Sequence, residues 1–458
     1  MNDQFKNDAK NDRDELVEKL YKFAQDNNKI EPHLFDYYGV KKGLRNNDGT
    51  GVLVGLTQIG EVHGYIMDEG QKISVDGRLR YRGINVEDIV DNCQADGRFG
   101  FEEVCFLLLF GKLPNKNDLD TFNNILGESR ILPNGFVEDV ILKGQSSNIM
   151  NKLARCILAC YSYEEDPDDL TIHKVLCRCI DLIARIPSFV AYSYMAKAHY
   201  KNNKSLYIHI PKGEQSTAEC FLHMIRPDCQ FTKLEAETLD LSLILHAEHG
   251  GGNNSTFVTR VATSSGTDTY SAIAAGVGAL KGPKHGGANL KVMEMIKDIK
   301  TNVSNWDNEE AVRDYLIKIL KKEAFDRSGL IYGMGHAVYT LSDPRAVLLK
   351  KKAAELAKLK NMETEFELYN TIERISPDLF EELRGNGKDL CANVDLYSGF
   401  VYKMLGIPED LYTPLFAIAR IPGWCAHSME ELISGGKIIR PAYRTLIQIK
   451  DYKPLSER

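Results

Sequence analysis

The spacing of apolar residues is the feature that most limits how this chain can fold. In "NEEAVRDYLIKILKKE", residues 308–323, apolar side chains recur every three to four residues and charged ones take the opposite face, which is the pattern of an amphipathic helix. The segments "FEEVCFLLLFGKL", "LKVMEMIKDI" and "DPRAVLLKKKAAELAKL" follow the same rule. Strand-like alternation is confined to residues 52–82, where the Gly and Asp spacing predicts small hairpins. The chain is therefore expected to be all-α, with many short helices and small β-hairpins near the N-terminus.

Composition narrows the class of protein. The 458 residues suffice for two or three domains, or for one large domain and a smaller one. The net charge of −7 and the lack of a basic block disfavour a nucleic-acid-binding protein, and the longest apolar runs fall short of the roughly 18 residues of a membrane span. Ten cysteines without a CxxC pair indicate reduced, mostly buried thiols. The N-terminus has no apolar signal segment and is rich in Asp, so the expected location is cytoplasmic.

Four glycine-rich loops lie in the second half of the chain, and three of them carry a histidine beside glycine. They are "HAEHGGGNNS" (246–255), "LKGPKHGGANL" (280–290), "GLIYGMGHAVY" (329–339) and "ISGGKIIRP" (433–441). Because glycine has no side chain, backbone and imidazole can both approach a small ligand closely. Downstream, Asp343-Pro344 predicts a helix start with Asp as N-cap and Pro first. Arg345 then lies where a cation is electrostatically disfavoured, which favours a functional role for it.

Common catalytic motifs are missing from the sequence. It contains no GxxxxGK[ST] phosphate loop, no GxSxG elbow and no HExxH helix. His246 and His249 are three residues apart with an acid between them, but a metal site would need a third ligand from elsewhere, and a structural histidine is the commoner outcome.

The remaining polar residues fit one kind of chemistry. Neutral imidazoles polarise a carbonyl or donate a proton, arginine forks match carboxylates, and a carboxylate at the start of an apolar helix is a candidate base. Together the residues fit carbon-acid chemistry on an anionic substrate, without a metal or a nucleophile. Singly, each has a simpler interpretation as a turn histidine, a surface arginine or, for Asp395, a helix N-cap. The set is His249, His285, His336, Asp395, Arg345, Arg420 and Arg440.

At these residues the sequence resembles the citrate synthase family. The matching blocks are "LILHAEHGGGNNSTFVTR", "AIAAGVGALKGPKHGGAN", "GMGHAVYTLSDPR", "NVDLYSGFVYKMLGI" and "ARIPGWCAHSMEELISGGKIIRPAYR", within a resemblance that runs from about residue 50 to about residue 445. It implies a two-domain helical fold and a homodimer or a multiple of one. The implied division is an N-terminal helical extension (1–50), a large domain (51–286 and 398–458) and a small domain (287–397) that closes over the substrates.

The resemblance also implies a reaction and residue roles. Family members condense acetyl-CoA with oxaloacetate to give citrate and CoA, without a metal or a permanently bound cofactor. Asp395 then corresponds to the base, His285 to the group that hydrogen-bonds the thioester oxygen, and His336 to the acid at the ketone. The oxaloacetate ligands are His249, Arg345, Arg420 and, from the neighbouring subunit, Arg440. The implied CoA contacts are Ile331, Gly333, Met334, Gly335, Val338 and Lys388.

Two positions depart from the family pattern on the CoA side. Met334 replaces an aromatic or small residue, and Thr340 stands where many members have a basic residue for the CoA phosphates. Lys388 and the run Lys350–Lys352 are the candidate replacements, although a solvated helix face is the simpler interpretation of the run.

Four other functions remain open from the sequence. A 2-methylcitrate synthase would share the site and prefer propionyl-CoA, and one methylene in an apolar pocket is worth only about 1–3 kcal/mol. Citryl-CoA cleavage is less favoured, because the chain has no partner domain for ATP-driven cleavage. A non-catalytic helical regulator is expected to have lost one of His285, His336 or Asp395, and all three are present. A metal-dependent hydrolase using His246 and His249 would lose its activity on chelation.

Overall fold

The computed structural model describes residues 2–46, 49–69, 71–385 and 390–458. They form two compact units, residues 1–55 and 56–458. The first unit contains α1 (Asn2–Asn27), α2 (His33–Tyr37) and a short 3-10 turn at Lys42–Leu44. The described part of the chain has no helix that combines the length and apolar character needed to span a membrane.

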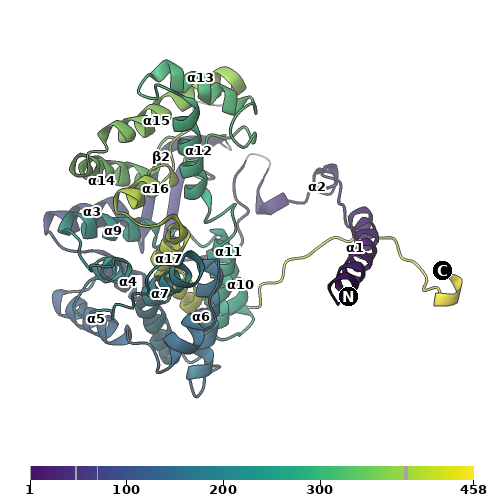
Figure 1. The fold of residues 1–458 in the computed structure, drawn as a ribbon, viewed down its shortest axis with the longest axis horizontal. Coiled ribbons are helices and arrows are strands. Elements are labelled where there is room, and N and C mark those ends of the chain that lie inside the picture. The colour runs from purple at the N-terminus through teal and green to yellow at the C-terminus, as the bar shows by residue number, and fades with distance from the viewer. Residues whose placement is uncertain (1, 47–48, 70, 386–389) are drawn as a thin grey trace. The chain divides into compact units, whose positions relative to one another are not determined.

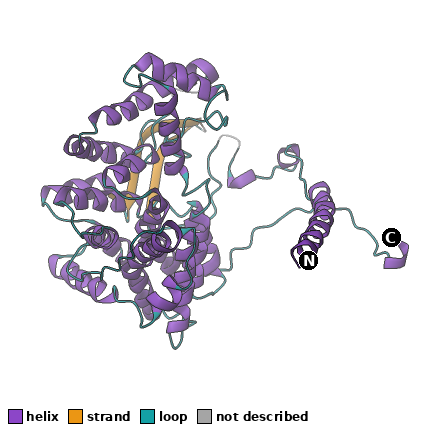
Figure 2. Cartoon of the chain, viewed as in Figure 1, coloured by secondary structure: helices purple, strands orange, loops and turns teal. Residues whose placement is uncertain are grey.

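The second unit is helical apart from one small sheet (Figures 1 and 2). Its helices are α3 (Val86–Ala95), α4 (Phe101–Phe110), α5 (Lys116–Ser129), α6 (Ile149–Cys160), α7 (Ile172–Asn202), α8 (Thr217–Ile225), α9 (Lys233–His246), α10 (Asn254–Ser264), α11 (Thr269–Leu280), α12 (Ala288–Asn302), α13 (Glu309–Leu320), α14 (Pro344–Lys360), α15 (Glu363–Arg384), α16 (Asp395–Met404) and α17 (Tyr412–Ile433). The predicted all-α class is confirmed.

Local sequence explains where several of these helices begin. Asp343 caps α14 by accepting the backbone N–H of Arg345, and Pro344 is the first helical residue, as predicted. Thr232 and Glu235 form a reciprocal capping box at α9. Helix α17 packs against α4, α7, α9, α10 and α11, which leaves it almost wholly buried up to Met429. Figure 1 shows α12 to α16 grouped at one end of the unit.

The sheet has three antiparallel strands rather than separate small hairpins. Strands β1 (Gly60–Asp68) and β2 (Gln71–Tyr81) pair with each other, and β3 (Ile84–Asn85) extends β2. Residues 52–59, which were expected to belong to the strand region, precede the first strand. Two of their backbone N–H groups donate to side chains rather than to a neighbouring strand. The N–H of Gln58 donates to Glu430 (2.7 Å), and that of Ile59 donates to Thr57 (3.1 Å).

The hairpin supports the segment that follows His336. A Cβ added at Gly64 would come 2.6 Å from the carbonyl oxygen of Val338, and one at Gly77 would come 2.1 Å from that of Ser342. Only glycine allows this approach of two backbones. The hairpin is therefore part of the framework of the site.

All ten cysteines are free. Seven of them are buried: Cys93, Cys105, Cys156, Cys160, Cys179, Cys220 and Cys425. The prediction that most of the thiols are buried is confirmed.

Candidate active site

Two loops far apart in sequence are joined directly before α16. Met334 and Ala392 form an isolated antiparallel bridge, with flanking N···O distances of 2.7 and 2.9 Å. The side chain of Asn393 donates to the carbonyl of Gly335 (2.8 Å) and accepts the backbone N–H of Asp395 (3.0 Å). The loop that carries His336 and the helix start that carries Asp395 are thus held together by backbone and side-chain bonds.

The hydrogen bonds of His336 define its tautomer. Its Nδ1 accepts the backbone N–H groups of Val338 (3.0 Å) and Tyr339 (3.1 Å). A backbone amide can only donate, so Nδ1 has no proton and the neutral ring carries it on Nε2. The Tyr339 ring stacks on the imidazole, with centroids 4.7 Å apart. His336 therefore presents an N–H donor from a fixed ring.

Arg345 is paired with the residue that caps its helix. Its Nε and Nη2 donate to the two carboxylate oxygens of Asp343 at 3.0 and 2.7 Å, and both side chains are buried. Although burial opposes the charge, Asp343 raises the pKa of Arg345. The same carboxylate accepts the backbone N–H of Val394 (3.3 Å), next to Asp395. Asp343 thus compensates the charge of Arg345, which lies at the unfavourable N-terminal end of α14. Asp343 also links Arg345 to the start of α16.

Asp395 is the first residue of α16, and the N-cap is Val394. The alternative interpretation of Asp395 as an N-cap is therefore wrong. Burial raises its pKa to about 6, an effect that Arg345 opposes and Asp343 reinforces. A carboxylate with this pKa is a stronger base than an exposed one and is still ionised at neutral pH.

His249 lies against His336. The two ring centroids are 5.1 Å apart and the planes are nearly perpendicular. Burial, followed by the charge of Arg345, lowers the pKa of His249 well below its ordinary value, so the ring is neutral. Its Nε2 is buried without a hydrogen-bond partner among the described residues. An unpaired buried polar atom costs about 1–3 kcal/mol, and a ligand would remove that cost.

Arg420 also has buried nitrogen atoms without a hydrogen-bond partner among the described residues. Its Nε donates to the carbonyl of His246 at 2.6 Å, whereas Nη1 and Nη2 are buried with no partner in the described ranges. The side chain is 0% exposed, and burial lowers its pKa to about 10. A guanidinium with two unpaired nitrogens is suited to a carboxylate ligand.

His285 is held by Ser255. The backbone N–H of Ser255 points at Nε2 of the imidazole (3.4 Å), and the hydroxyl lies 2.9 Å from the same atom. Because the amide can only donate, Nε2 accepts and the proton lies on Nδ1. Burial, followed by the charge of Arg420, lowers the pKa of His285 to about 4. The rings of His285 and Phe416 are 6.1 Å apart, and Phe416 also lies under Arg420. This histidine is a second neutral donor.

His246 has a structural contact. Its Nδ1 lies 2.8 Å from the carbonyl of Ser242 inside α9, and burial lowers its pKa to about 3. Within the described residues, no group of three or more His, Cys, Asp or Glu side chains is arranged to hold a metal ion.

Arg440, Lys350 and Lys352 do not take part in the contacts described so far. Arg440 is exposed in the segment that follows α17, and Lys388 lies outside the described residues. Lys350 and Lys352 lie on α14 and pair with Glu373 (2.5 Å) and Glu355 (3.1 Å); both are partly buried, and of the run only Lys351 is exposed. The predicted CoA contacts Ile331, Gly333, Met334, Gly335 and Val338 share one loop with His336.

Sequence reasoning missed several residues that organise the site. Asp343 was assigned only as a cap, and Asn393 and Ser255 had no assigned role, although all three lie within quoted site motifs. Glu248 and His427 were visible as the acid of "HAEH" and the histidine of "CAHSMEE". Their contacts join residues far apart in the chain, which spacing cannot reveal.

Comparisons with known proteins agree with this geometry. The family model described as citrate synthase, C-terminal domain, matches residues 48–442. Citrate synthase of Haloferax volcanii is 35% identical over 92% of this chain and 99% of its own. The 2-methylcitrate synthase 1 of Corynebacterium glutamicum is 34% identical over 92% of this chain and 98% of its own.

A solved structure shows the same architecture. It is the ternary complex of citrate synthase from Thermoplasma acidophilum with carboxymethyl coenzyme A and oxaloacetate, which superposes with a TM-score of 0.74 at 27% identity. The match covers 91% of this chain and 99% of that one. Because the family model matches residues 48–442 and the relatives align over most of the chain, the protein belongs to the citrate synthase family.

Proposed function

We propose that the protein condenses acetyl-CoA with oxaloacetate and water to give citrate and CoA. The observation that carries this proposal is one cluster that combines a buried carboxylate of raised pKa with two fixed imidazole N–H donors and unpaired buried nitrogens. Deprotonating a thioester methyl group requires a base together with stabilisation of the developing oxyanion. The cluster supplies both.

Oxaloacetate has two carboxylates and a ketone, and the site has groups for each. The unpaired Nη atoms of Arg420 suit one carboxylate. Arg345 uses its Nε–Nη2 edge for Asp343, so a second carboxylate would take the edge formed by Nη1 and Nη2. His249 would bond through Nε2. Arg440 would reach the substrate from the second subunit of a homodimer.

The reaction then follows from the tautomers. Asp395 takes a proton from the acetyl-CoA methyl group while Nδ1–H of His285 donates to the thioester oxygen. The enolate carbon attacks the ketone carbon, and the proton on Nε2 of His336 passes to the new alkoxide. Water cleaves the resulting citryl thioester to citrate and CoA. Fixing both substrates face to face lowers the barrier by as much as about 7–11 kcal/mol in well-oriented cases.

Further expectations accompany this proposal. Residues 287–397 form a small domain that closes over the substrates and excludes water until the carbon–carbon bond exists. We expect CoA to lie along the 331–338 loop. The ten free cysteines favour a reducing compartment, the cytoplasm.

The second candidate is 2-methylcitrate synthesis from propionyl-CoA, because a 2-methylcitrate synthase matches nearly as well as a citrate synthase. Thiol release measured with each acyl-CoA and saturating oxaloacetate separates the two. We expect kcat/KM to be at least about tenfold higher for acetyl-CoA. A preference for propionyl-CoA would establish the alternative, and no thiol release with either would refute both.

A further inference from the structure

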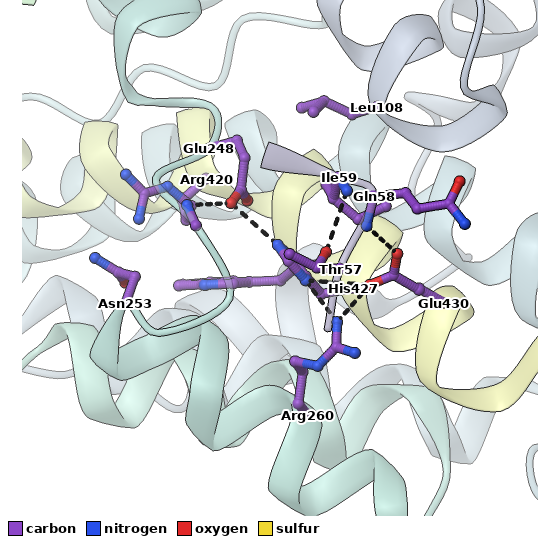
Figure 3. Close-up of polar contacts among 12 residues, drawn as sticks. Thr57, Gln58, Ile59, Leu108, Glu248, Asn253, Arg260, Arg420, His427 and Glu430 are labelled. Atoms are coloured by element: carbon purple, nitrogen blue, oxygen red, sulfur yellow. Dashed lines mark hydrogen bonds and ion pairs between the residues drawn. The ribbon is translucent and has the colours of Figure 1, made fainter. Parts of the chain in front are cut away.

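A chain of polar contacts lies behind the turn that carries His249 (Figure 3). Glu248 is 0% exposed, and its Oε1 accepts the backbone N–H of Gly250 and lies 3.0 Å from Nε2 of His427. The bond to Gly250 closes the backbone turn around His249. The position of the His249 ring therefore depends on where the Glu248 carboxylate is held.

His427 is oriented by Arg260. Its Nδ1 lies 2.7 Å from Nη1 of Arg260, and a guanidinium can only donate. Nδ1 is therefore the acceptor, and Nε2–H donates to Glu248. His427 itself is completely buried on α17. A single neutral tautomer thus links the guanidinium on α10 to the carboxylate behind the site.

Arg260 is fixed in turn by acids at the end of α17. It pairs with Glu430 (2.7 Å) and Glu431 (3.2 Å). Glu430 also accepts the backbone N–H of Gln58 (2.7 Å), in the segment before β1. Three parts of the chain that are distant in sequence therefore converge on this one row of contacts (Figure 3).

Two glycines enclose the Glu248 side chain. A Cβ at Gly60 would lie 2.7 Å from Cγ of Glu248, and one at Gly423 would lie 2.6 Å from its Oε2. The carboxylate is therefore confined as well as hydrogen-bonded. Arg420 is equally buried, and its charge and that of Glu248 stabilise each other. Loss of the Glu248 charge would leave the Arg420 guanidinium uncompensated.

We propose that His427 and Arg260 are positioning residues for oxaloacetate binding. They hold Glu248 ionised and in place, and Glu248 holds both the His249 turn and the charge balance of Arg420. This inference rests on the proposed function, since it assigns oxaloacetate to His249 and Arg420. It predicts an effect on oxaloacetate affinity that is larger than any effect on acetyl-CoA affinity.

The test compares His427→Gln with His427→Leu. The Gln amide retains one acceptor for Arg260 and one donor for Glu248, whereas Leu retains neither. Hydrogen bonds to a charged group are worth enough for a ten- to hundredfold effect, so we expect His427→Leu to raise the KM for oxaloacetate by roughly that factor. The KM for acetyl-CoA should change less than about twofold, and His427→Gln should stay within about threefold of the wild type.

Two further variants separate a positioning role from general destabilisation. His223→Leu removes another buried histidine, on α8, and should lower the melting temperature without changing the KM for oxaloacetate. Arg260→Met keeps His427 in the chain and should raise that KM severalfold, which tests the proposal even if His427→Leu does not fold. The proposal is overturned if Arg260→Met leaves the KM unchanged, or if the Gln and Leu variants are equally impaired. Wild-type thiol release tests the proposed function separately.

Discussion

The imidazole rings of His249 and His336 meet edge to face, with centroids 5.1 Å apart and planes at 82°. One ring belongs to the turn after α9 and the other to the glycine loop before α14. His336 has its acceptor nitrogen occupied by two amides, and His249 has a buried nitrogen without a partner among the described residues. This contact places the N–H donor of His336 beside the unpaired nitrogen of His249, which is the arrangement that the proposed reaction needs at the ketone of oxaloacetate.

Replacing His336 by Asn should remove the acid at the ketone. The Asn carbonyl can still accept a backbone N–H, but it places no N–H where Nε2 lies. We expect kcat to fall by about 10²–10⁴. Steady-state kinetics provide the measurement, and a fall of less than tenfold would remove His336 from that role.

The activity should depend on the ionisation of Asp395. Because its pKa is raised to about 6, the carboxylate is protonated below that pH and cannot accept the methyl proton. We expect kcat/KM for acetyl-CoA to fall tenfold per pH unit below about pH 6. A rate profile that is flat between pH 5 and 7 would argue against Asp395 as the base.

The same raised pKa has a consequence for stability. The folded protein holds the Asp395 proton more tightly than the unfolded chain, so stability falls as pH rises from about 4 to about 6. Asp395→Asn removes this loss. Thermal unfolding should show the variant gaining stability relative to the wild type as pH rises through this window, and a constant difference would contradict the assignment.

Arg420→Met should abolish ligand-induced stabilisation. In the wild type, oxaloacetate at 100 times its Kd should add about 2.7 kcal/mol to the free energy of unfolding. The variant lacks the two unpaired nitrogens that we expect the ligand to satisfy, so its melting temperature should not respond to oxaloacetate. An undiminished response would show that Arg420 does not bind the substrate.

Gly333→Ala tests how the two loops are held together. Gly333 has φ +86°, and an added Cβ would lie 2.9 Å from Cα of Leu396, next to Asp395. The strain should cost about 1–3 kcal/mol of stability, and displacement of α16 should lower kcat as well. Gly266→Ala is the matched control, because Gly266 has φ +79° with nothing within 4 Å of the new Cβ. Gly266→Ala should lose stability and keep its kcat. Equal kcat in the two variants would contradict the claim that the Gly333 loop positions α16.

Local signals in the sequence predicted the elements better than the contacts between them. The start of α14 could be predicted because Asp343 and Pro344 act on the helix that they begin. The all-α fold class could be predicted because helical periodicity is a local property of the sequence. The strand region was predicted, but its first strand begins at Gly60, since the backbone N–H of Gln58 donates to the distant Glu430 and that of Ile59 donates to Thr57.

The contacts that organise the site were not predictable in the same way. The second role of Asp343, the link through Asn393 and the row from Glu248 to Arg260 all join residues that only folding brings together. No periodicity in the sequence encodes them. Resemblance to a family assigned roles to the reacting groups, whereas the supporting groups emerged from the hydrogen bonds.

The most direct test follows the methyl carbon of acetyl-CoA into the product. With acetyl-CoA labelled with ¹³C in the methyl group and unlabelled oxaloacetate, the wild type should place the label in a methylene carbon of citrate, observed by NMR. Asp395→Asn should still bind oxaloacetate by calorimetry while label transfer falls by about 10²–10⁴. Label recovered only as acetate, or transfer undiminished in Asp395→Asn, would contradict the account.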